Sequence, residues 1–475
     1  MAKLQYHLPC SWERRAPARH CRAMPGWDSA PATEKPSWGS AFPGGRSRFF
    51  QAAKKRLSRD CAGIILFLRP PGGEMVTQRD RRSQAKTLDP SRTRGFDPSE
   101  ARPLDPSGQG GGYAIPREGV MDIAIVGAGM AGLSAGWWLR REGHRVLVFE
   151  RHYKPGGRMN SRRKAGLVVD HGDRFIARNS PVLRELIVDC GLHGETRPIE
   201  SPIYTVGPDG SFLETREQAT DANRLTFPDG MLTLPEALRR SMGGFYSIGV
   251  TAVERDDVLG KFIVRSEPPL RNAETQVDAV VFACAAPEAF KVSQPIHPLL
   301  NAPFLERLAK VEYTRCLTLI AALEQVQTPE VFYGLVLPRE TSSILMWIAF
   351  EDRKCKGREV EGYSSLVAHG TPEASERFWK LDEEPILEKL YAEARRIVPQ
   401  LPAKWRWARI KRWEVAHLKN PKAFVSPVEF PVSPEGVGVV FCGDYCVGHG
   451  VEAAAQSGRE AADRLLRKLQ GGAAS

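Results

Sequence analysis

Short apolar runs alternate with amphipathic stretches from Met121 to the end of the chain. The apolar runs predict strands, and stretches with apolar residues at helical spacing predict helices. This alternation is typical of an α/β architecture. The predicted strands are Asp122–Val126, Arg145–Glu150, Ser247–Glu254, Phe262–Ser266, Ala279–Ala283, Leu317–Leu323, Ile344–Phe350 and Gly438–Phe441. The predicted helices are Ala131–Glu142, Pro181–Cys190, Leu234–Met242, Pro385–Ile397 and Val451–Lys468.

Residues 1–120 show neither period and are rich in Arg, Pro, Gly and Ser. A segment of this composition buries too little apolar surface to offset the entropy lost on ordering. Three interpretations stay open: a disordered tail, a mis-assigned translation start, and a structured domain. The second interpretation rests on the strand that follows Met121 directly, and on Arg117-Glu118-Gly119 as a translated ribosome-binding site.

The net charge of +11 is concentrated in the first quarter of the chain. The segment before Met121 holds 21 Lys and Arg against 11 Asp and Glu, and the rest holds 46 against 45. A basic tail is weak evidence for binding nucleic acid, and the balanced remainder gives no support for it. We therefore expect no nucleic-acid partner.

Nine cysteines are scattered without CxxC pairs or histidines at zinc spacing, so no metal site is expected. Several lie in apolar runs, which is typical of buried thiols in a reducing compartment. No apolar run approaches the roughly 18 residues needed to span a bilayer. These features predict a cytoplasmic protein without a membrane span.

A glycine-rich loop is the strongest chemical signal, because it follows a predicted strand and opens a predicted helix. In such loops the glycines permit a tight turn, close approach of the backbone to a pyrophosphate, and close helix–strand packing. An acidic residue at the end of the second strand, Glu150, is placed to accept hydrogen bonds from the ribose hydroxyls. The loop residues are Gly127, Ala128, Gly129, Met130, Ala131 and Gly132.

Arg151, the residue after Glu150, is a further candidate contact of the cofactor. A second glycine-rich element follows closely, in the sequence 155–161 (PGGRMNS). It resembles the Gly-Gly-Arg-x-x-Ser/Thr element of the flavin amine-oxidase superfamily. The resemblance implies that Gly157 and Arg158 run along the pyrophosphate of FAD. A guanidinium suits this role, since it can pair bidentately with phosphate oxygens.

Within that superfamily the chain resembles the renalase-like NAD(P)/FAD-dependent oxidoreductases. The segment 170–177 (DHGDRFIA) resembles their Asp-His-Gly segment near the flavin ring and contributes Asp173 to the candidate site. The segments 347–349, 356–358 and 368–375 also have counterparts there. A strand at 247–254 resembles the one whose backbone holds the adenine, with Val250 as the candidate contact and a plain core strand as the alternative.

The C-terminal part of the chain resembles the closing Gly-Asp, Val-Glu-x-Ala and Ser-Gly elements of the superfamily, at residues 442–446, 448–453 and 457–461. The resemblance implies that Gly443 and Asp444 bind the ribityl chain and that Val451 contacts the pyrimidine end of the flavin. A helix N-terminus there would stabilise negative charge on reduced flavin. The chain departs from many relatives in having His449-Gly450 before Val-Glu, and it lacks a cysteine motif for covalent attachment. We expect non-covalent FAD.

The predicted fold is a Rossmann-type FAD-binding domain combined with a mixed-sheet α+β substrate domain. The FAD-binding domain takes residues 121–200, 236–292 and 411–475, and the substrate domain takes 201–235 and 293–410. Residues 1–120 form the N-terminal extension. The resemblance covers roughly residues 121–469.

The leading functional hypothesis is an FAD-dependent oxidase. It takes a hydride from a small amine or dihydronicotinamide-like substrate, with dioxygen or another molecule as acceptor and NAD(P)H as a possible partner. No catalytic residue is assigned, because no nucleophile–base pair is visible. For His171, His369 and His449, a structural role or a hydrogen bond to the flavin is favoured over acid–base chemistry. Trp347, Phe350, Tyr313 and Trp413 are candidates for an apolar pocket wall, with ordinary core as the default for each.

Three alternatives remain open on the sequence. A flavin monooxygenase would need NAD(P)H, although only one dinucleotide loop is visible. A non-catalytic redox sensor or partner-binding module would hold the cofactor without turnover. A plain NAD-dependent dehydrogenase is disfavoured by the C-terminal Gly-Asp element.

Overall fold

The computed structural model describes residues 119–214, 224–267, 274–419, 424, 427–431 and 438–471. The chain divides into two compact units, Met1–Arg94 and Gly95–Ser475, and every described residue belongs to the second unit. The predictions for residues 1–120 therefore lie outside the described residues, apart from Gly119 and Val120.

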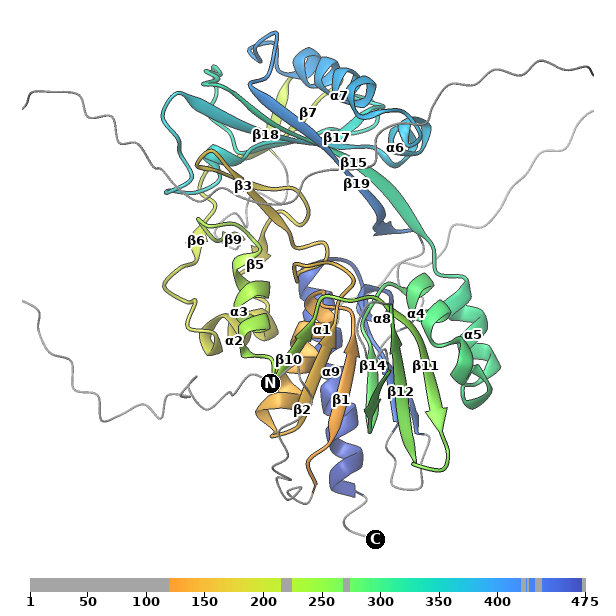
Figure 1. The fold of residues 1–475 in the computed structure, drawn as a ribbon. Helices are drawn as coiled ribbons and strands as arrows, with labels where there is room; N and C mark the ends of the chain where they lie inside the picture. The colour runs from red at the N-terminus through yellow and green to blue at the C-terminus, as the bar shows by residue number, and fades with distance from the viewer. Residues whose placement is uncertain are drawn as a thin grey trace, which may run out of the picture. The chain divides into compact units, whose positions relative to one another are not determined.

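A six-stranded sheet carries the glycine-rich loop (Figure 1). Its spatial order is β10 (Gly244–Tyr246), β2 (Arg145–Phe149), β1 (Asp122–Val126), β14 (Ala279–Phe282), β21 (Gly438–Phe441) and β20 (Val428–Pro431). All neighbours are parallel except β20, which runs antiparallel to β21. The carboxyl end of β1 is the point where the strand order reverses, which is the usual ligand position in such sheets.

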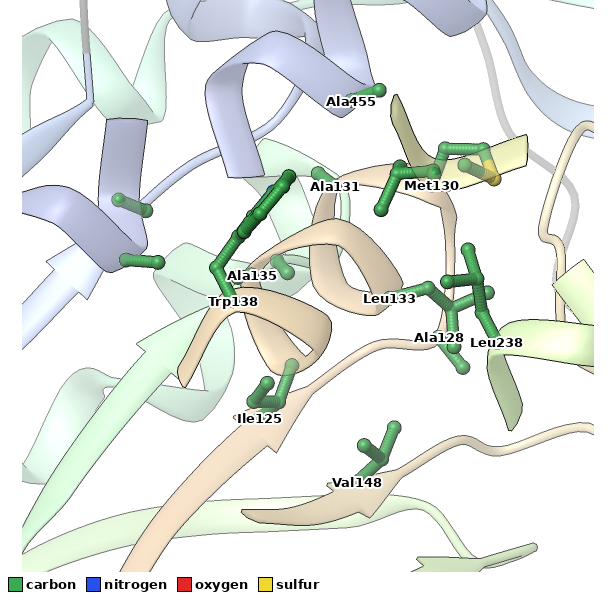
Figure 2. Close-up of a cluster of buried hydrophobic side chains, with 14 of the residues drawn as sticks. Ile125, Ala128, Met130, Ala131, Leu133, Ala135, Trp138, Val148, Leu238 and Ala455 are labelled. Carbon is green, nitrogen blue, oxygen red and sulfur yellow. The ribbon is translucent and has the colours of Figure 1, made fainter. Parts of the chain in front are cut away.

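Helices cover one face of this sheet. They are α1 (Met130–Arg141), α2 (Pro181–Asp189), α3 (Thr233–Ser241) and α9 (Gly450–Gly471), and their apolar side chains form one core with the sheet. Figure 2 shows Trp138 of α1 in the same cluster as Ile125 of β1 and Ala455 of α9. The Oγ of Ser134 in α1 donates to the carbonyl of Ala455 at 2.7 Å, which links the first helix to the last.

A second core lies against the opposite face. It includes a three-stranded antiparallel sheet of β11 (Val250–Asp256), β12 (Lys261–Ser266) and β13 (Glu274–Val277). The helices α4 (Ala286–Val292), η3 (Gln294–Leu299) and α5 (Ala302–Ala309) complete it. Phe282 and Phe441 stack with ring centroids 4.5 Å apart, and Phe304 packs on Phe441.

A seven-stranded sheet forms the other main layer. Its order is β19 (Trp407–Leu418), β15 (Tyr313–Glu324), β18 (Tyr363–Gly370), β17 (Leu345–Phe350), β16 (Gly334–Val336), β7 (Ile203–Val206) and β8 (Phe212–Glu214). Helices α6 (Pro372–Phe378) and α7 (Glu383–Ile397) follow β18, and Figure 1 shows α7 along one face of the sheet. Leu319 and Ile348 pack against Leu390 of α7 on that face.

Small elements cover the other face of the seven-stranded sheet. The hairpin of β3 (Ser161–Lys164) and β4 (Leu167–Asp170) places Leu167 and Val169 against Ile320 of β15. Its two-residue loop, Ala165 and Gly166, has positive φ at both positions, which matches the twist of a tight hairpin. The remaining elements are β5 (Ile176–Ala177), β6 (Arg197–Pro198), β9 (Arg224–Thr226), η4 (Glu351–Arg353) and α8 (Asp444–Val447).

A buried ion cluster joins β4 to the turn after β17. Asp170 accepts from Lys354 Nζ at 2.6 Å and from Arg358 Nη2 at 2.7 Å, and Arg358 Nη1 bonds Glu351 at 2.6 Å. All four side chains are at most 1% exposed. These cations hold the pKa of Asp170 far below its usual range, although burial acts in the opposite direction. Asp170 and Arg358, which lie in two of the renalase-like segments, are therefore structural partners.

The predicted α/β architecture, with a Rossmann-type unit and a mixed sheet, is confirmed. Most predicted elements are present with ends shifted by one to a few residues, and β11 begins at Val250 rather than Ser247. Several elements were not predicted, and β18 and β19 are the longest strands among them. The edge strand β19 carries Arg409, Lys411 and Arg412, which hide its apolar alternation. The domain division stays a prediction; β19 continues past residue 410, where the second substrate segment was expected to end.

Candidate functional site

The glycine-rich loop lies at the carboxyl end of β1 and is shaped by backbone contacts. Gly127 has a φ of +105°, and a Cβ there would lie 2.9 Å from the nitrogen of Cys284. A Cβ on Gly132 would lie 2.0 Å from the carbonyl oxygen of Gly127. Above Gly129, by contrast, a Cβ would meet nothing within 4 Å. The loop is therefore closed towards the protein and open at Gly129, as a pyrophosphate cradle requires.

The first turn of α1 begins at this loop, and no side chain caps it. An uncapped helix start offers N–H groups and partial positive charge to an anion. Met130 and Ala131 are themselves buried in the core, so only their backbone is available to a ligand. The start of α1 thus offers backbone donors to a phosphate.

Glu150 supports the loop directly. Its Oε2 accepts from the N–H of Ala128 at 2.9 Å, and its Oε1 accepts from the N–H of His152 at 3.0 Å. The neighbouring Arg151 forms an ion pair with Glu288 of α4 at 3.1 Å. Glu150 therefore fixes the loop, and its remaining lone pairs can accept from ribose hydroxyls.

The Gly-Gly-Arg element folds against the same loop. The N–H of Gly156 donates to the carbonyl of Ala128 at 2.7 Å, and Gly156 and Gly129 form an isolated parallel bridge. Gly156 and Gly157 both have positive φ, +100° and +55°. A Cβ on Gly157 would lie 3.4 Å from the Cα of Gly129, so the two glycines permit this close approach.

Arg158 joins this element to the C-terminal Gly-Asp element. Its Nη1 donates to Asp444 Oδ2 at 2.6 Å and to the carbonyl of Ala416 at 3.1 Å. The hydroxyl of Tyr313 donates to the other oxygen of Asp444 at 2.9 Å. Burial acts to lower the pKa of Arg158, but Asp444 outweighs it, and the pKa is raised. About a third of the Arg158 side chain stays accessible, whereas Asp444 is 5% exposed.

Tyr313 is the residue whose role the sequence analysis missed. It was a candidate for an apolar wall, yet its hydroxyl is a polar partner of the candidate ribityl-binding Asp444. Burial and the carboxylate both raise the pKa of Tyr313, so the phenol stays protonated. No local signal distinguishes it, because the contact spans 131 positions.

The C-terminal element is shaped by three glycines with positive φ, Gly443, Gly448 and Gly450. The N–H of Gly443 donates to Ser457 Oγ of α9 at 3.0 Å, which ties the Gly-Asp turn to the last helix. Val451 is 3% exposed in the core shared with α1. Its side chain therefore packs, and only its backbone can face a ligand.

Asp173 lies beside the Gly-Gly-Arg element. Its N–H donates to the carbonyl of Arg158 at 2.9 Å, and a Cβ on Gly172 would lie 1.8 Å from that same oxygen. Burial raises the pKa of Asp173 to about 6, aided by Glu452 and Asp444 and opposed by Arg158. Val250 lies at the start of β11, in the core that also contains Leu147 and Phe149 of β2.

His171 and His369 are neutral near pH 7. Burial, together with nearby cations, lowers the pKa of His171 to about 4 and that of His369 to about 3. Among the candidate wall residues, Phe350 packs in the core on the α7 face. Trp347 lies in a separate small core with Tyr333, while Trp413 is half-buried beside His171.

The structure thus brings three remote stretches together: the loop 127–132, the turn 156–158 and the Gly-Asp turn 443–444. Within the described ranges, no group of three or more His, Cys, Asp or Glu side chains has an arrangement that could hold a metal ion. No helix in the described part of the chain combines the length and apolar character needed to cross a bilayer.

Comparison with known proteins agrees with this arrangement. A model of NAD(P)-binding Rossmann-like domains matches residues 125–190. The chain is 42% identical over 72 residues to AofH of Mycobacterium tuberculosis, whose name assigns it to the flavin-containing monoamine oxidases. That match covers 15% of this chain and 16% of AofH, so only a short part of the curated relative is spanned. A 4,4'-diapophytoene desaturase of Staphylococcus aureus is 36% identical over 75 residues, 16% of this chain and 15% of the desaturase.

Among solved structures, the cyclohexylamine oxidase of Brevibacterium oxydans superposes with a TM-score of 0.57 over 74% of this chain and all of its own. Its sequence identity is 14%, so this likeness shows the fold alone. A model of flavin containing amine oxidoreductases matches residues 210–466, more than half of the chain. The chain therefore belongs to the flavin containing amine oxidoreductase family, and this membership places it among the flavin oxidoreductases.

Proposed function

We propose that the chain binds FAD without a covalent bond and oxidises a small molecule, an amine or a dihydronicotinamide-like compound. The single observation that carries the proposal is the meeting of three remote stretches around the open space above Gly129. When bound there, FAD would accept a hydride at N5 and pass the electrons to dioxygen or another acceptor. The narrower resemblance to renalase-like enzymes stays a prediction.

The residues of the chain have distinct roles in this proposal. Backbone N–H groups of the loop and of the first turn of α1 bind the pyrophosphate, and Glu150 binds a ribose. Arg158 has donors beyond the one engaged with Asp444 and offers them to a phosphate oxygen. Asp444 is held in place by Arg158 and Tyr313 and accepts from a ribityl hydroxyl.

The thiols near the site support non-covalent binding. Burial raises the pKa of Cys284 to about 12, and it also raises the pKa values of Cys442 and Cys446. A thiol that stays protonated is a poor nucleophile towards the flavin ring. Heat or acid denaturation should therefore release all of the flavin into the supernatant.

The experiment is to purify the full chain, record its visible spectrum and measure FAD per chain. Anaerobic bleaching is then screened with amines and with dihydronicotinamide isomers, and oxygen consumption is followed on readmission of air. Bleaching by a member of either class supports the proposal. Protein that shows no flavin absorption at about 450 nm, and cannot be reconstituted, contradicts it.

Two variants test the residue assignments. Arg158→Ala and Glu150→Gln should each lower flavin retention after gel filtration by about tenfold, as loss of a charge-assisted hydrogen bond predicts. Arg184→Ala, at an exposed position on α2, is the matched control and should retain FAD like the parent. Full occupancy in both site variants would refute the assignments while leaving the flavin itself established.

A further inference from the structure

A row of four side chains crosses the seven-stranded sheet on the face opposite α7. Lys411 of β19 pairs with Thr318 of β15, Thr318 pairs with His369 of β18, and His369 pairs with Trp347 of β17. Directly paired residues point to the same face of a sheet. A hydrogen bond of 2.9 Å between Thr318 Oγ1 and His369 Nδ1 agrees with this register.

The segment 171–174 packs on this row. The ring of His171 lies 5.5 Å from the ring of Trp413, and Lys411 Nζ lies 4.6 Å from the same Trp413 ring. The guanidinium of Arg174 lies 4.4 Å from the ring of Trp347. Because the N–H of Asp173 bonds the carbonyl of Arg158, the same segment also borders the candidate flavin site.

The charge near Lys411 is positive. Lys411 forms no ion pair with a described carboxylate, and its charged neighbour is Arg162, which lowers its pKa after the larger effect of burial. Three carboxylates near the 171–174 segment have partners: Asp170 pairs with Lys354 and Arg358, Asp444 pairs with Arg158, and Glu452 accepts from the N–H of Ala177. The carboxylate of Asp173 belongs to the segment itself, and burial raises its pKa.

His171 supplies an independent observation. The residue is 5% exposed, and its Nδ1 atom has no hydrogen-bond partner in the described part of the chain. A buried donor or acceptor without a partner costs about 1–3 kcal/mol, so such groups are rare unless a ligand or water forms the missing hydrogen bond. With the proton on Nδ1, this ring can donate one hydrogen bond beside the Lys411 ammonium.

We propose that the substrate of this site carries an anionic group, a carboxylate or a phosphate. Lys411 binds this group, and the Nδ1–H of His171 donates a hydrogen bond to it against the face of Trp413. This inference rests on the proposed function and names the substrate class. An alkylammonium group in the same place would lie beside the like charges of Lys411 and Arg162, which disfavours it.

The test measures binding of four one-ring probes to the flavin-loaded full chain by calorimetry: benzoate, phenyl phosphate, benzamide and benzylammonium. Benzoate or phenyl phosphate should bind at least about tenfold more tightly than benzamide, the gain of a hydrogen bond to a charged group. The preferred member of that pair identifies the anion as carboxylate or phosphate. Benzylammonium should bind most weakly.

Variants then assign the effect to Lys411. Lys411→Gln and Lys411→Met should each lower affinity for the preferred anion about tenfold and leave benzamide binding unchanged. The methionine variant keeps an apolar stem on Trp413, so it serves if the glutamine variant folds poorly. Lys389→Gln, on α7 at the other face of the sheet, is the matched control and should bind all probes like the parent.

Two outcomes overturn the inference: benzamide or benzylammonium binding as tightly as the anions, or anion affinity that is unchanged in both Lys411 variants. Calorimetry measures probe binding without relying on the flavin, so the same titration can be carried out on protein that lacks flavin. Missing flavin would count against the proposed function, whereas flavin-loaded protein without anion preference would count against this inference alone.

Discussion

Asp173 and Asp444 lie near the same guanidinium, that of Arg158, but their environments differ. Asp444 pairs with Arg158 and accepts from Tyr313 as well. Asp173 has the backbone contact with Arg158, and its pKa is raised to about 6 by burial first and by Glu452 and Asp444 second. At the residue scale, therefore, one carboxylate has a guanidinium and a phenol as partners, and the other carries a cost when ionised.

Replacing Asp173 with Asn should remove the cost of ionising this buried carboxylate. The folded pKa of about 6 exceeds the ordinary value of 3.8, so ionisation destabilises the fold above pH 6 and the cost disappears below about pH 4. Allowing for partial exposure, we expect Asp173→Asn to raise the free energy of unfolding at pH 7.5 by about 1–2 kcal/mol. The measurement is urea unfolding at pH 7.5 and pH 4 with equal flavin content.

Asp257→Asn is the control for this prediction, because Asp257 is 89% exposed and should show no gain at either pH. A gain for Asp173→Asn that persists undiminished at pH 4 would show that the stabilisation does not come from the carboxylate charge.

At the scale of elements, the close packing of α1 and α9 connects the glycine-rich loop to the C-terminal element. A Cβ on Gly458 of α9 would lie 2.0 Å from the carbonyl oxygen of Ala131. One turn of helix away from the loop, the Oγ of Ser134 donates to Ala455. The two helix starts therefore hold their positions through backbone contacts that tolerate no side chain at residue 458.

Gly458→Ala should separate the two helices and weaken the site. The clash is with backbone, so the helices must shift, and we expect a loss of about 2–3 kcal/mol in unfolding free energy together with weaker FAD retention. Thermal unfolding and FAD per chain are the measurements. Gly136→Ala, within α1, is the matched control, because its Cβ meets only the ends of flexible side chains: the sulfur of Met242 at 2.9 Å and the Cδ1 of Ile125 at 3.1 Å. This control should be neutral or gain up to about 1 kcal/mol from helix propensity; equal loss in both variants would contradict the account.

At the scale of the whole molecule, every candidate site residue lies after Met121. A chain that begins at Met121 retains all described residues except Gly119 and Val120. We expect this shorter chain to bind FAD with the stoichiometry and melting temperature of the full chain. A loss of flavin on removal of residues 1–120 would show that the N-terminal segment contributes to the site.

The sequence by itself determined the glycine-rich elements of the candidate site. The loop 127–132, Glu150 and the turn 156–158 were predicted because each depends on local requirements: glycine where φ is positive or backbones approach, and polar groups at strand ends. The parallel core strands were equally visible, since burial on both faces requires continuous apolar runs.

Only the tertiary structure decided which distant groups meet. Three groups of contacts join residues more than a hundred positions apart. They are the pairing of Asp444 with Arg158 and Tyr313, the buried cluster around Asp170, and the Lys411–His171 cluster. Such contacts leave no period or spacing in the sequence, because they depend on strand order and on which face of a sheet a residue occupies. The β19 register, which places Lys411 opposite Thr318, is the deciding example: one residue of slip would turn this ammonium towards α7.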